Sequence, residues 1–359
     1  MSLQEFTSPS PPSPQRSRRP TKAALARRLG LRMVHPEELT WRRRRRGRRF
    51  GYLDENGGPI RSREARTRLA SLAVPPAYED VRYAADPNAH IQAVGRDAAG
   101  RLQYRYHPEW EKVREQRKAR RLLRLAQCLP LVRRRVARHL AGKAPTRELA
   151  LAAVIELVAR TAIRPGSDTY ARQHGTRGAV TLLKSNVRIE RGEVVLDFIG
   201  KGSKPVVKRC QAPGLRRALE VVRKLPGERL FQYRNGDGAV HAVRRGQVNA
   251  FLRELAGCDI SLKDLRTLYA SAAVLEQLAP VEPAASARAR RRQVLNAVRA
   301  TADELVNTPA ICRRSYVHQT VVTAFEAGKL KRHAAELKRA RSPARRERAL
   351  AKVVAVEVL

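Results

Sequence analysis

The sequence predicts an α+β protein in which a small, mostly β N-terminal domain precedes a larger, mainly α domain that contains a small β-hairpin. Two patterns carry this prediction. From residue 50 to about residue 106, short apolar runs alternate with turn signals, which is typical of strands and hairpins. From about Pro108 onwards, apolar residues recur every three or four positions, which indicates amphipathic helices. We therefore expect the two domains at residues 36–110 and 111–325.

The expected elements follow from the same periodicities. Residues 100–107 alternate like a strand and place Leu102, Tyr104 and Tyr106 on one face. In the larger domain, strand-like runs at 187–191 and 194–199 are joined by a turn at Gly192. The helices that surround them are expected at 114–140, with an interruption at Pro130, and at 147–163, 247–255, 262–276 and 291–305.

Both ends of the chain are predicted to lie outside the domains. Residues 1–35 are rich in Ser, Pro and Arg, which is typical of a disordered basic tail. Residues 326–359 hold ten Lys and Arg against four acidic residues in a helical pattern, which suggests a mobile basic extension. A further basic run occupies residues 42–49 and is broken only by Gly47.

The net charge indicates the class of partner. The 74 Lys and Arg residues against 33 Asp and Glu leave +41, and the natural counterpart of such a surplus is a polyphosphate such as DNA. An Arg-rich coding bias that enriches ordinary solvated faces is the alternative explanation. No apolar stretch approaches the length of a membrane span, and the first residues lack the apolar core of a secretion signal, so we expect a cytoplasmic protein without membrane association.

No cofactor is expected from the sequence. The four cysteines are scattered, without a CxxC pair or a nearby histidine at metal-ligand spacing, and they fit reduced thiols. No GxxxxGK[ST] phosphate-binding loop is present either. We therefore predict neither a metal site nor an ATP site.

Four local motifs in the larger domain supply groups that suit one reaction, attack on a DNA phosphodiester. They are Ile163-Arg164-Pro165-Gly166, Gly200-Lys201-Gly202, Lys263-Asp-Leu-Arg266-Thr267, and the segment from Asn307 to Tyr316. Two guanidinium groups can neutralise the charge on the non-bridging oxygens, a lysine on a turn can protonate the leaving 5′-oxygen, and a tyrosine can form a phosphodiester that conserves the bond energy for religation.

These motifs, in this order, resemble the four active-site segments of the bacterial and poxviral type IB DNA topoisomerases. The segments PPAY (75–78), HIQAVGRDAAGR (90–101) and QYRYHPEW (103–110) are also typical of the bacterial branch, so the resemblance covers residues 48–322. It implies relaxation of supercoiled DNA through transient single-strand cleavage and a 3′-phosphotyrosyl intermediate, without ATP or metal. It further implies a monomer, associated with the nucleoid, whose two domains form a clamp around duplex DNA.

The resemblance also assigns roles to residues. Tyr316 would be the nucleophile, Arg164 and Arg266 would hold the scissile phosphate, Lys201 would be the general acid, and Asn307 would donate a further hydrogen bond to a non-bridging oxygen. Residues that would contact the DNA without reacting are Lys263 and Tyr170 near the cleavage site, and Tyr104 and Tyr106 in the major groove.

Some of these residues have competitors. Tyr269, three residues after Arg266, is a rival nucleophile, and Lys204 lies on the same turn as Lys201. Tyr104 and Tyr106 could instead serve only the packing of the sheet. Asparagine at position 307 is usual in bacterial relatives, whereas the viral branch has histidine, and Pro165 and His174 also depart from the pattern of the family.

Two other functions use similar features. A tyrosine site-specific recombinase has the same phosphotyrosyl chemistry, but that family carries HxxR where this chain has Lys263-x-x-Arg266, and its N-terminal domain is helical. A non-enzymatic basic DNA-binding protein would explain the charge but not the ordered motifs.

Overall fold

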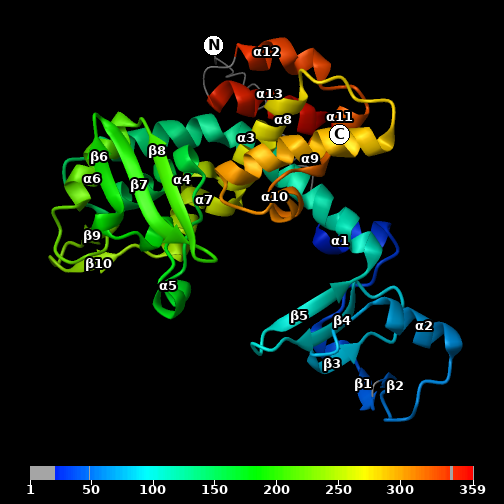
Figure 1. The fold of residues 1–359 in the computed structure, drawn as a ribbon. Coiled ribbons are helices and arrows are strands. Elements are labelled where there is room, and N and C mark those ends of the chain that lie inside the picture. Colours follow the sequence, from blue (N-terminus) through cyan, green and yellow to red (C-terminus); the bar gives the residue numbers. More distant parts are fainter. Residues whose placement is uncertain (1–20, 48, 340–342, 359) are drawn as a thin grey trace, which may run out of the picture. The chain divides into compact units, whose positions relative to one another are not determined.

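The computed structural model describes residues 21–47, 49–339 and 343–358, and its chain divides into two compact units (Figure 1). The first unit ends at Arg114 and the second begins at Glu115. Each unit has its own hydrophobic core. The expected α+β class, with a β-rich N-terminal part and a helix-rich remainder, is confirmed.

The N-terminal unit is built on a five-stranded antiparallel sheet with the order β2-β1-β3-β4-β5. The strands are β1 (Trp41–Arg46), β2 (Arg49–Leu53), β3 (Glu79–Tyr83), β4 (Ile91–Arg96) and β5 (Leu102–Tyr106). Helix α2 (Arg63–Ser71) covers one face, where its Leu69 packs with Tyr83 and Ala93. The basic run at 42–49 therefore forms most of β1 and provides the first residue of β2.

The prediction of a disordered tail is wrong for residues 21–35. Helix α1 (Lys22–Arg28) begins at an N-cap Thr21, and the side chains of Leu25 and Leu31 are buried against Trp110 and Val113. The contact partners lie about eighty residues further along the chain, so no local pattern could reveal this burial. Residues 1–20 lie outside the described residues.

The catalytic residues predicted above all lie in the second unit, which combines helices with a small sheet. Helix α3 (Pro108–Leu140) starts in the first unit and runs on without a break, so the predicted interruption at Pro130 is wrong. Pro130 is exposed, while Leu125, Leu129 and Val132 on the other side of the helix are buried in the core.

Helix α4 (Arg147–Thr161) is buried along most of its length and forms the centre of this unit. The strands β6 (Val187–Glu190), β7 (Glu193–Gly200) and β8 (Lys204–Cys210) form an antiparallel sheet beside it. The third strand was not predicted. The remaining helices include α5 (Asp168–His174), α6 (Pro213–Val222), α7 (Arg245–Ala256), α8 (Leu262–Leu278), α9 (Ala287–Glu304), α10 (Pro309–Ser315) and α11 (Gln319–Glu326).

The prediction of a mobile C-terminal extension is wrong for most of that segment. A short helix α12 (Ala334–Lys338) and helix α13 (Pro343–Val358) follow α11, and α13 packs against α8 and α11 (Figure 1). Leu350, Val353 and Val354 of α13 are buried in the main core. The apolar stripe of this helix therefore belongs to the second unit.

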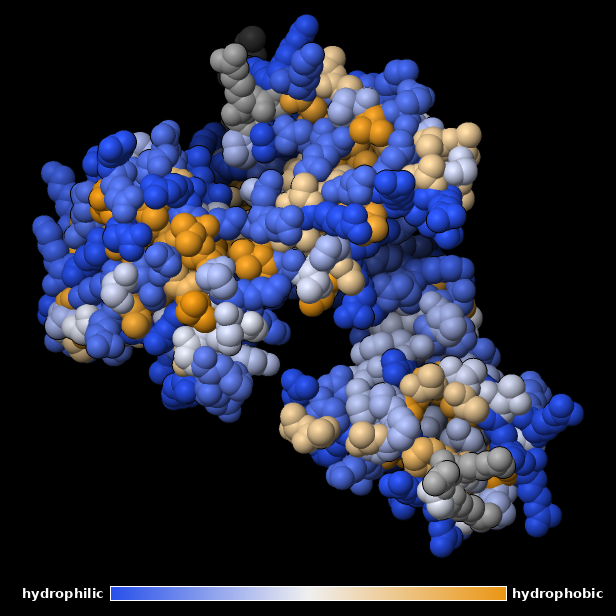
Figure 2. Space-filling view, viewed as in Figure 1, coloured by the Kyte–Doolittle hydropathy of each residue, from blue (hydrophilic) through white to orange (hydrophobic). Residues whose placement is uncertain are grey.

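Hydrophilic side chains cover most of the visible face of each unit, as the large surplus of Lys and Arg requires (Figure 2). Within the described part of the chain, no helix is both long enough and apolar enough to cross a membrane.

Candidate active site

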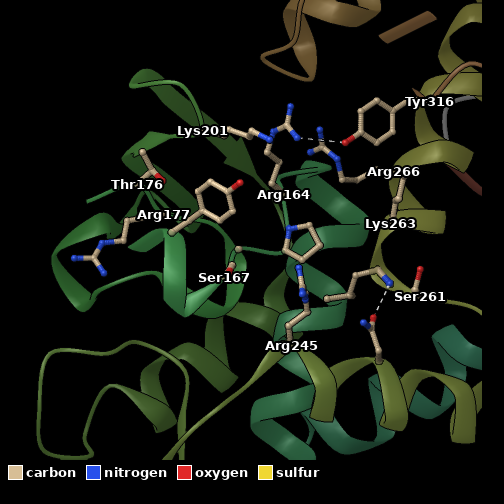
Figure 3. A pocket seen from close by; sticks show the side chains of 15 residues that line it. Arg164, Ser167, Thr176, Arg177, Lys201, Arg245, Ser261, Lys263, Arg266 and Tyr316 are labelled. Carbon is tan, nitrogen blue, oxygen red and sulfur yellow. Dashed lines mark hydrogen bonds between the residues drawn. The ribbon is translucent and has the colours of Figure 1, made fainter. Parts of the chain in front are cut away.

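A pocket of about 510 Å³ in the second unit collects residues from all four motifs. Arg164, Lys201, Arg266 and Tyr316 gather at one end of the pocket, and Arg245 lies at the other end (Figure 3). These side chains come from the segment after α4, the β7–β8 turn, α8, the end of α10 and the start of α7. The hydroxyl of Tyr316 and the guanidinium of Arg164, for example, meet across 152 residues of sequence.

Tyr316 occupies the C-terminal end of α10, where its backbone N–H donates to the carbonyl of Cys312. Its side chain is nearly buried, and its hydroxyl lies 3.5 Å from Nη1 of Arg164. Burial alone would raise the pKa of this phenol, but the charges of Arg266 and Arg164 outweigh burial, and the pKa of Tyr316 falls below its ordinary value. The phenolate that a nucleophilic attack requires is therefore favoured here.

Arg266 is the largest fully buried side chain of the described residues and lies under the ring of Tyr316. Its guanidinium carbon is 4.8 Å from the ring centroid, and its Nη1 donates to the carbonyl of Ala162. Its Nε and Nη2 are buried without a partner in the described structure. Buried donors without partners cost free energy, so an anionic ligand that accepted hydrogen bonds from these two nitrogens would recover that cost.

The loop that carries Arg164 is held by an unusually close backbone contact. Gly166 has φ +88°, and a Cβ atom on Gly178 would lie 2.6 Å from the carbonyl oxygen of Arg164. Only glycine fits at position 178, which explains its place in the sequence. The backbone N–H groups of Ala179 and Val180 donate to the carbonyls of Arg164 and Pro165. The second of these bonds uses the backbone carbonyl of Pro165, which a proline keeps. The proline at this position, which differs from the pattern of the family, is therefore compatible with the loop.

Asn307 lies beside Arg164, where its Oδ1 accepts a hydrogen bond from Nη2 of the arginine. The chain reaches it through Val306, which adopts φ +51°, a left-handed conformation that is strained for a β-branched residue. Thr308 then caps α10 through a hydrogen bond from the N–H of Ile311, with Pro309 in the first turn. The amide Nδ2 of Asn307 is buried and has no partner among the described residues.

Lys201 lies on the turn between β7 and β8, and Gly202 and Ser203 after it both adopt positive φ. Its ammonium group lies 5.6 Å from the ring centroid of Tyr170, and the residue as a whole is exposed. Lys201 lines the pocket, and Lys204 pairs with Gly200 at the start of β8. This placement favours Lys201 as the lysine that acts on a bound phosphodiester.

The DNA-contact residues predicted near the cleavage site also line the pocket. Tyr170 on α5 is 43% exposed, and Lys263 lies in the first turn of α8. Arg245 and Asn249 of α7 line the same pocket, although no motif in the sequence predicted them. An exposed arginine in so basic a chain carries no signal of its own, and only the tertiary structure distinguishes Arg245.

The rival nucleophile Tyr269 has a different environment. Its hydroxyl donates to Oε2 of Glu304 at 2.7 Å, and burial together with this carboxylate raises the pKa of the phenol. A raised pKa disfavours the phenolate. Tyr269 also lines another, smaller cavity beside α13.

In the N-terminal unit, the predicted tyrosines are exposed and stacked. The ring centroids of Tyr104 and Tyr106 lie 5.8 Å apart, and the ring of Tyr106 also stacks on that of Trp110. The exposed fractions of the two tyrosines, 38% and 40%, leave much of each ring uncovered by the fold.

The same face of this sheet carries an arginine cluster that no sequence motif predicted. Arg42 pairs with Arg82, Arg82 with Val94, and Val94 with Tyr104, so all four lie on the face opposite α2. Together with Arg96, the two arginines line a hollow of about 530 Å³. The sequence shows only a uniform charge run at 42–46, because the alternation of faces is invisible when every residue is arginine.

Comparison with known protein families agrees with this geometry. Residues 107–343 match the model of the catalytic core of eukaryotic DNA topoisomerase I, and residues 49–97 match the N-terminal domain of bacterial DNA topoisomerase IB. The chain belongs to the type IB DNA topoisomerases. It is therefore an isomerase that acts on DNA.

Two viral relatives are similar along the chain. DNA topoisomerase 1B of Acanthamoeba polyphaga mimivirus is 28% identical over 283 residues, which cover 77% of this chain and 84% of the relative. DNA topoisomerase 1 of Rabbit fibroma virus (strain Kasza) is 25% identical over 172 residues, which cover 45% of this chain and 48% of that relative.

Proposed function

We propose that this enzyme relaxes supercoiled duplex DNA by cutting and resealing one strand through Tyr316. The observation that carries the proposal is that the hydroxyl of the buried Tyr316 lies 3.5 Å from Arg164 and that its ring packs on the guanidinium of Arg266. Both cations lower the pKa of the phenol, and the unpartnered N–H groups of Arg266 can bind phosphate oxygens.

In the proposed reaction, the oxygen of Tyr316 attacks the scissile phosphorus as its proton passes to solvent. The bond between phosphorus and the 5′-oxygen breaks, and Lys201 gives a proton to that oxygen. Arg164, Arg266 and the amide of Asn307 stabilise the charge on the non-bridging oxygens. The product is a 3′-phosphotyrosyl link, the free 5′ end swivels, and reversal of the same steps reseals the strand.

The side chains named here supply the charge stabilisation and the proton transfer, so the scheme proceeds without ATP or a metal ion. The contacts with DNA outside the reacting phosphate would come from Lys263 and Tyr170, and in the N-terminal unit from Tyr104, Tyr106 and the neighbouring arginines. We further propose that the enzyme acts as a monomer on DNA of the cytoplasmic nucleoid and prefers supercoiled molecules. The clamp around the duplex stays a prediction of the family resemblance.

The decisive experiment is incubation of the full chain with negatively supercoiled plasmid in EDTA and without ATP. A ladder of relaxed topoisomers is expected. A requirement for Mg²⁺ and ATP, or no relaxation at any enzyme concentration, would contradict the proposal. Recombined rather than relaxed products would instead indicate a site-specific recombinase.

A further inference from the structure

The peptide segment just after Tyr316 is buried, and one side chain satisfies two of its backbone hydrogen-bonding groups. Here α10 ends and α11 begins, so the backbone groups between the two helices lack regular helical partners. Ser271 of α8, which is fully buried, donates its hydroxyl to the carbonyl of Tyr316 at 3.1 Å. The hydroxyl oxygen of Ser271 also accepts the backbone N–H of His318 at 3.0 Å.

Helix α8 therefore contacts Tyr316 at two places, the aromatic ring and the backbone carbonyl. Arg266, five residues before Ser271, lies under the phenol ring, while Ser271 holds the backbone of the same tyrosine. Arg266 is itself held by the carbonyl of Ala162, next to the loop that carries Arg164. Helix α8 thus carries both Arg266, which lies against the phenol ring, and Ser271, which holds the backbone of the same residue.

We infer that Ser271 is a positioning residue that fixes the backbone of Tyr316 so that the phenol stays against Arg266 and in line with the scissile phosphate. This inference rests on the proposed role of Tyr316 as the nucleophile. Ser271 does not line the pocket, and it acts through the residue that it holds. Its hydroxyl is the group that matters, because that hydroxyl both donates to Tyr316 and accepts from His318.

The test compares Ser271→Ala with Ser271→Thr, which keeps the hydroxyl, in the full chain. Single-turnover cleavage of a duplex suicide substrate is measured at saturating enzyme across pH, together with the affinity for uncleaved duplex and the melting temperature. We expect Ser271→Ala to cleave about 10- to 100-fold more slowly, since a displacement of about 1 Å costs on the order of 10²-fold in rate. Ser271→Thr should recover most of the rate, and duplex affinity should be unchanged.

The pH profile separates positioning from simple loss of stability. Arg266, Arg164 and Lys263 are the cations that lower the pKa of Tyr316. A phenol that moves away from them loses that effect, so the rising limb of the rate should shift to higher pH in Ser271→Ala. A matched control is Val222→Ala on α6, which opens a cavity in the same core at a fully buried position outside the pocket lining. The control should lower the melting temperature and leave both the cleavage rate and its pH profile unchanged.

The inference is overturned if Ser271→Ala cleaves at the parent rate with the parent pH profile, or if Val222→Ala at a similar melting temperature loses as much activity. If Ser271→Ala does not fold, Ser271→Cys takes its place, because cysteine has a similar size and a weaker hydrogen-bonding group. We expect this variant to cleave at an intermediate rate and to show a pH shift in the same direction. Cleavage at the parent rate would again overturn the inference. Failure of the proposed function has a different signature, namely an adduct that still forms on a Tyr316→Phe protein.

Discussion

Asn307 offers the sharpest single test of the site, because the structure gives its two amide atoms different tasks. Its Oδ1 accepts from Arg164, and its Nδ2 is buried with no partner among the described residues. The carbonyl end therefore holds the arginine, and the NH₂ end can donate to a non-bridging phosphate oxygen. Replacement by alanine removes both functions at once.

The expected loss of cleavage rate in Asn307→Ala follows from the loss of its N–H donor. Loss of one preorganised donor to a developing oxyanion costs about 2.7–4 kcal/mol in the barrier, which corresponds to about 10²–10³ in rate. Asn307→Ala should therefore cleave slowly but measurably. Asn307→Asp separates the two tasks, because a carboxylate keeps the acceptor for Arg164 but cannot donate when ionised. If the donor matters, the Asp variant is at least as slow as the Ala variant, since its charge also repels the phosphate.

Asn307→His completes the series. An imidazole N–H can occupy the donor position, so this variant should keep much of the activity and gain a pH dependence near its ordinary pKa of about 6.5. The assay is single-turnover cleavage of a suicide duplex across pH. An Asp variant at the parent rate would show that Asn307 only holds Arg164. If the Ala variant cleaves at the parent rate, Asn307 has only a structural role in the segment before α10.

The remaining predictions test other parts of the mechanism and fold. Tyr316→Phe should abolish the covalent adduct on denaturing gels while duplex binding remains, because one hydroxyl is removed and the cations stay; a persisting 3′-linked adduct would refute this role. Lys201→Ala should slow cleavage of normal DNA but recover on a substrate with a bridging 5′-sulfur, which leaves without protonation; equal defects on both substrates would remove Lys201 from the acid role. Replacing Arg42, Arg82 and Arg96 together by Gln should flatten the plot of log affinity against log salt, by about 0.9 for each phosphate that the protein no longer neutralises. Deleting 343–359 should lower the melting temperature of the second unit, because the deletion uncovers the core residues against which α13 packs.

The arginine prediction has a matched control in the same unit. Arg61, Arg63 and Arg66 are exposed residues in and just before α2, which covers the other face of the sheet. Replacing these three by Gln removes the same charge. If both triple variants flatten the salt dependence equally, the sheet face has no special role, and the arginines act only through net charge.

Several residues that line the candidate site could be predicted from the sequence because its motifs are local. Lys263 and Arg266 are three residues apart on one helix, Lys201 lies on a glycine turn, and Thr308 with Pro309 marks the start of a helix. Residue type and short spacing suffice for such features, because capping, turn formation and helical periodicity depend on neighbours in the chain. The division into a β-rich and a helix-rich part followed from the same short-range patterns.

What the sequence could not indicate depends on contacts between distant segments. The burial of Leu25 against Trp110, the continuation of α3 through Pro130, and the packing of α13 on α8 all arise from partners far along the chain. Strand β8 was missed because its lysines hide the alternation that a strand normally shows.

The clearest example is Arg266, whose residue type predicts an exposed side chain. It is buried because the carbonyl of Ala162 accepts from it and the ring of Tyr316 covers it. The chain alone determined which groups carry the proposed reaction, since that depends on residue chemistry. Only the tertiary structure decided how close they lie and how their charges act on one another, because both depend on distances between atoms that the folded chain sets.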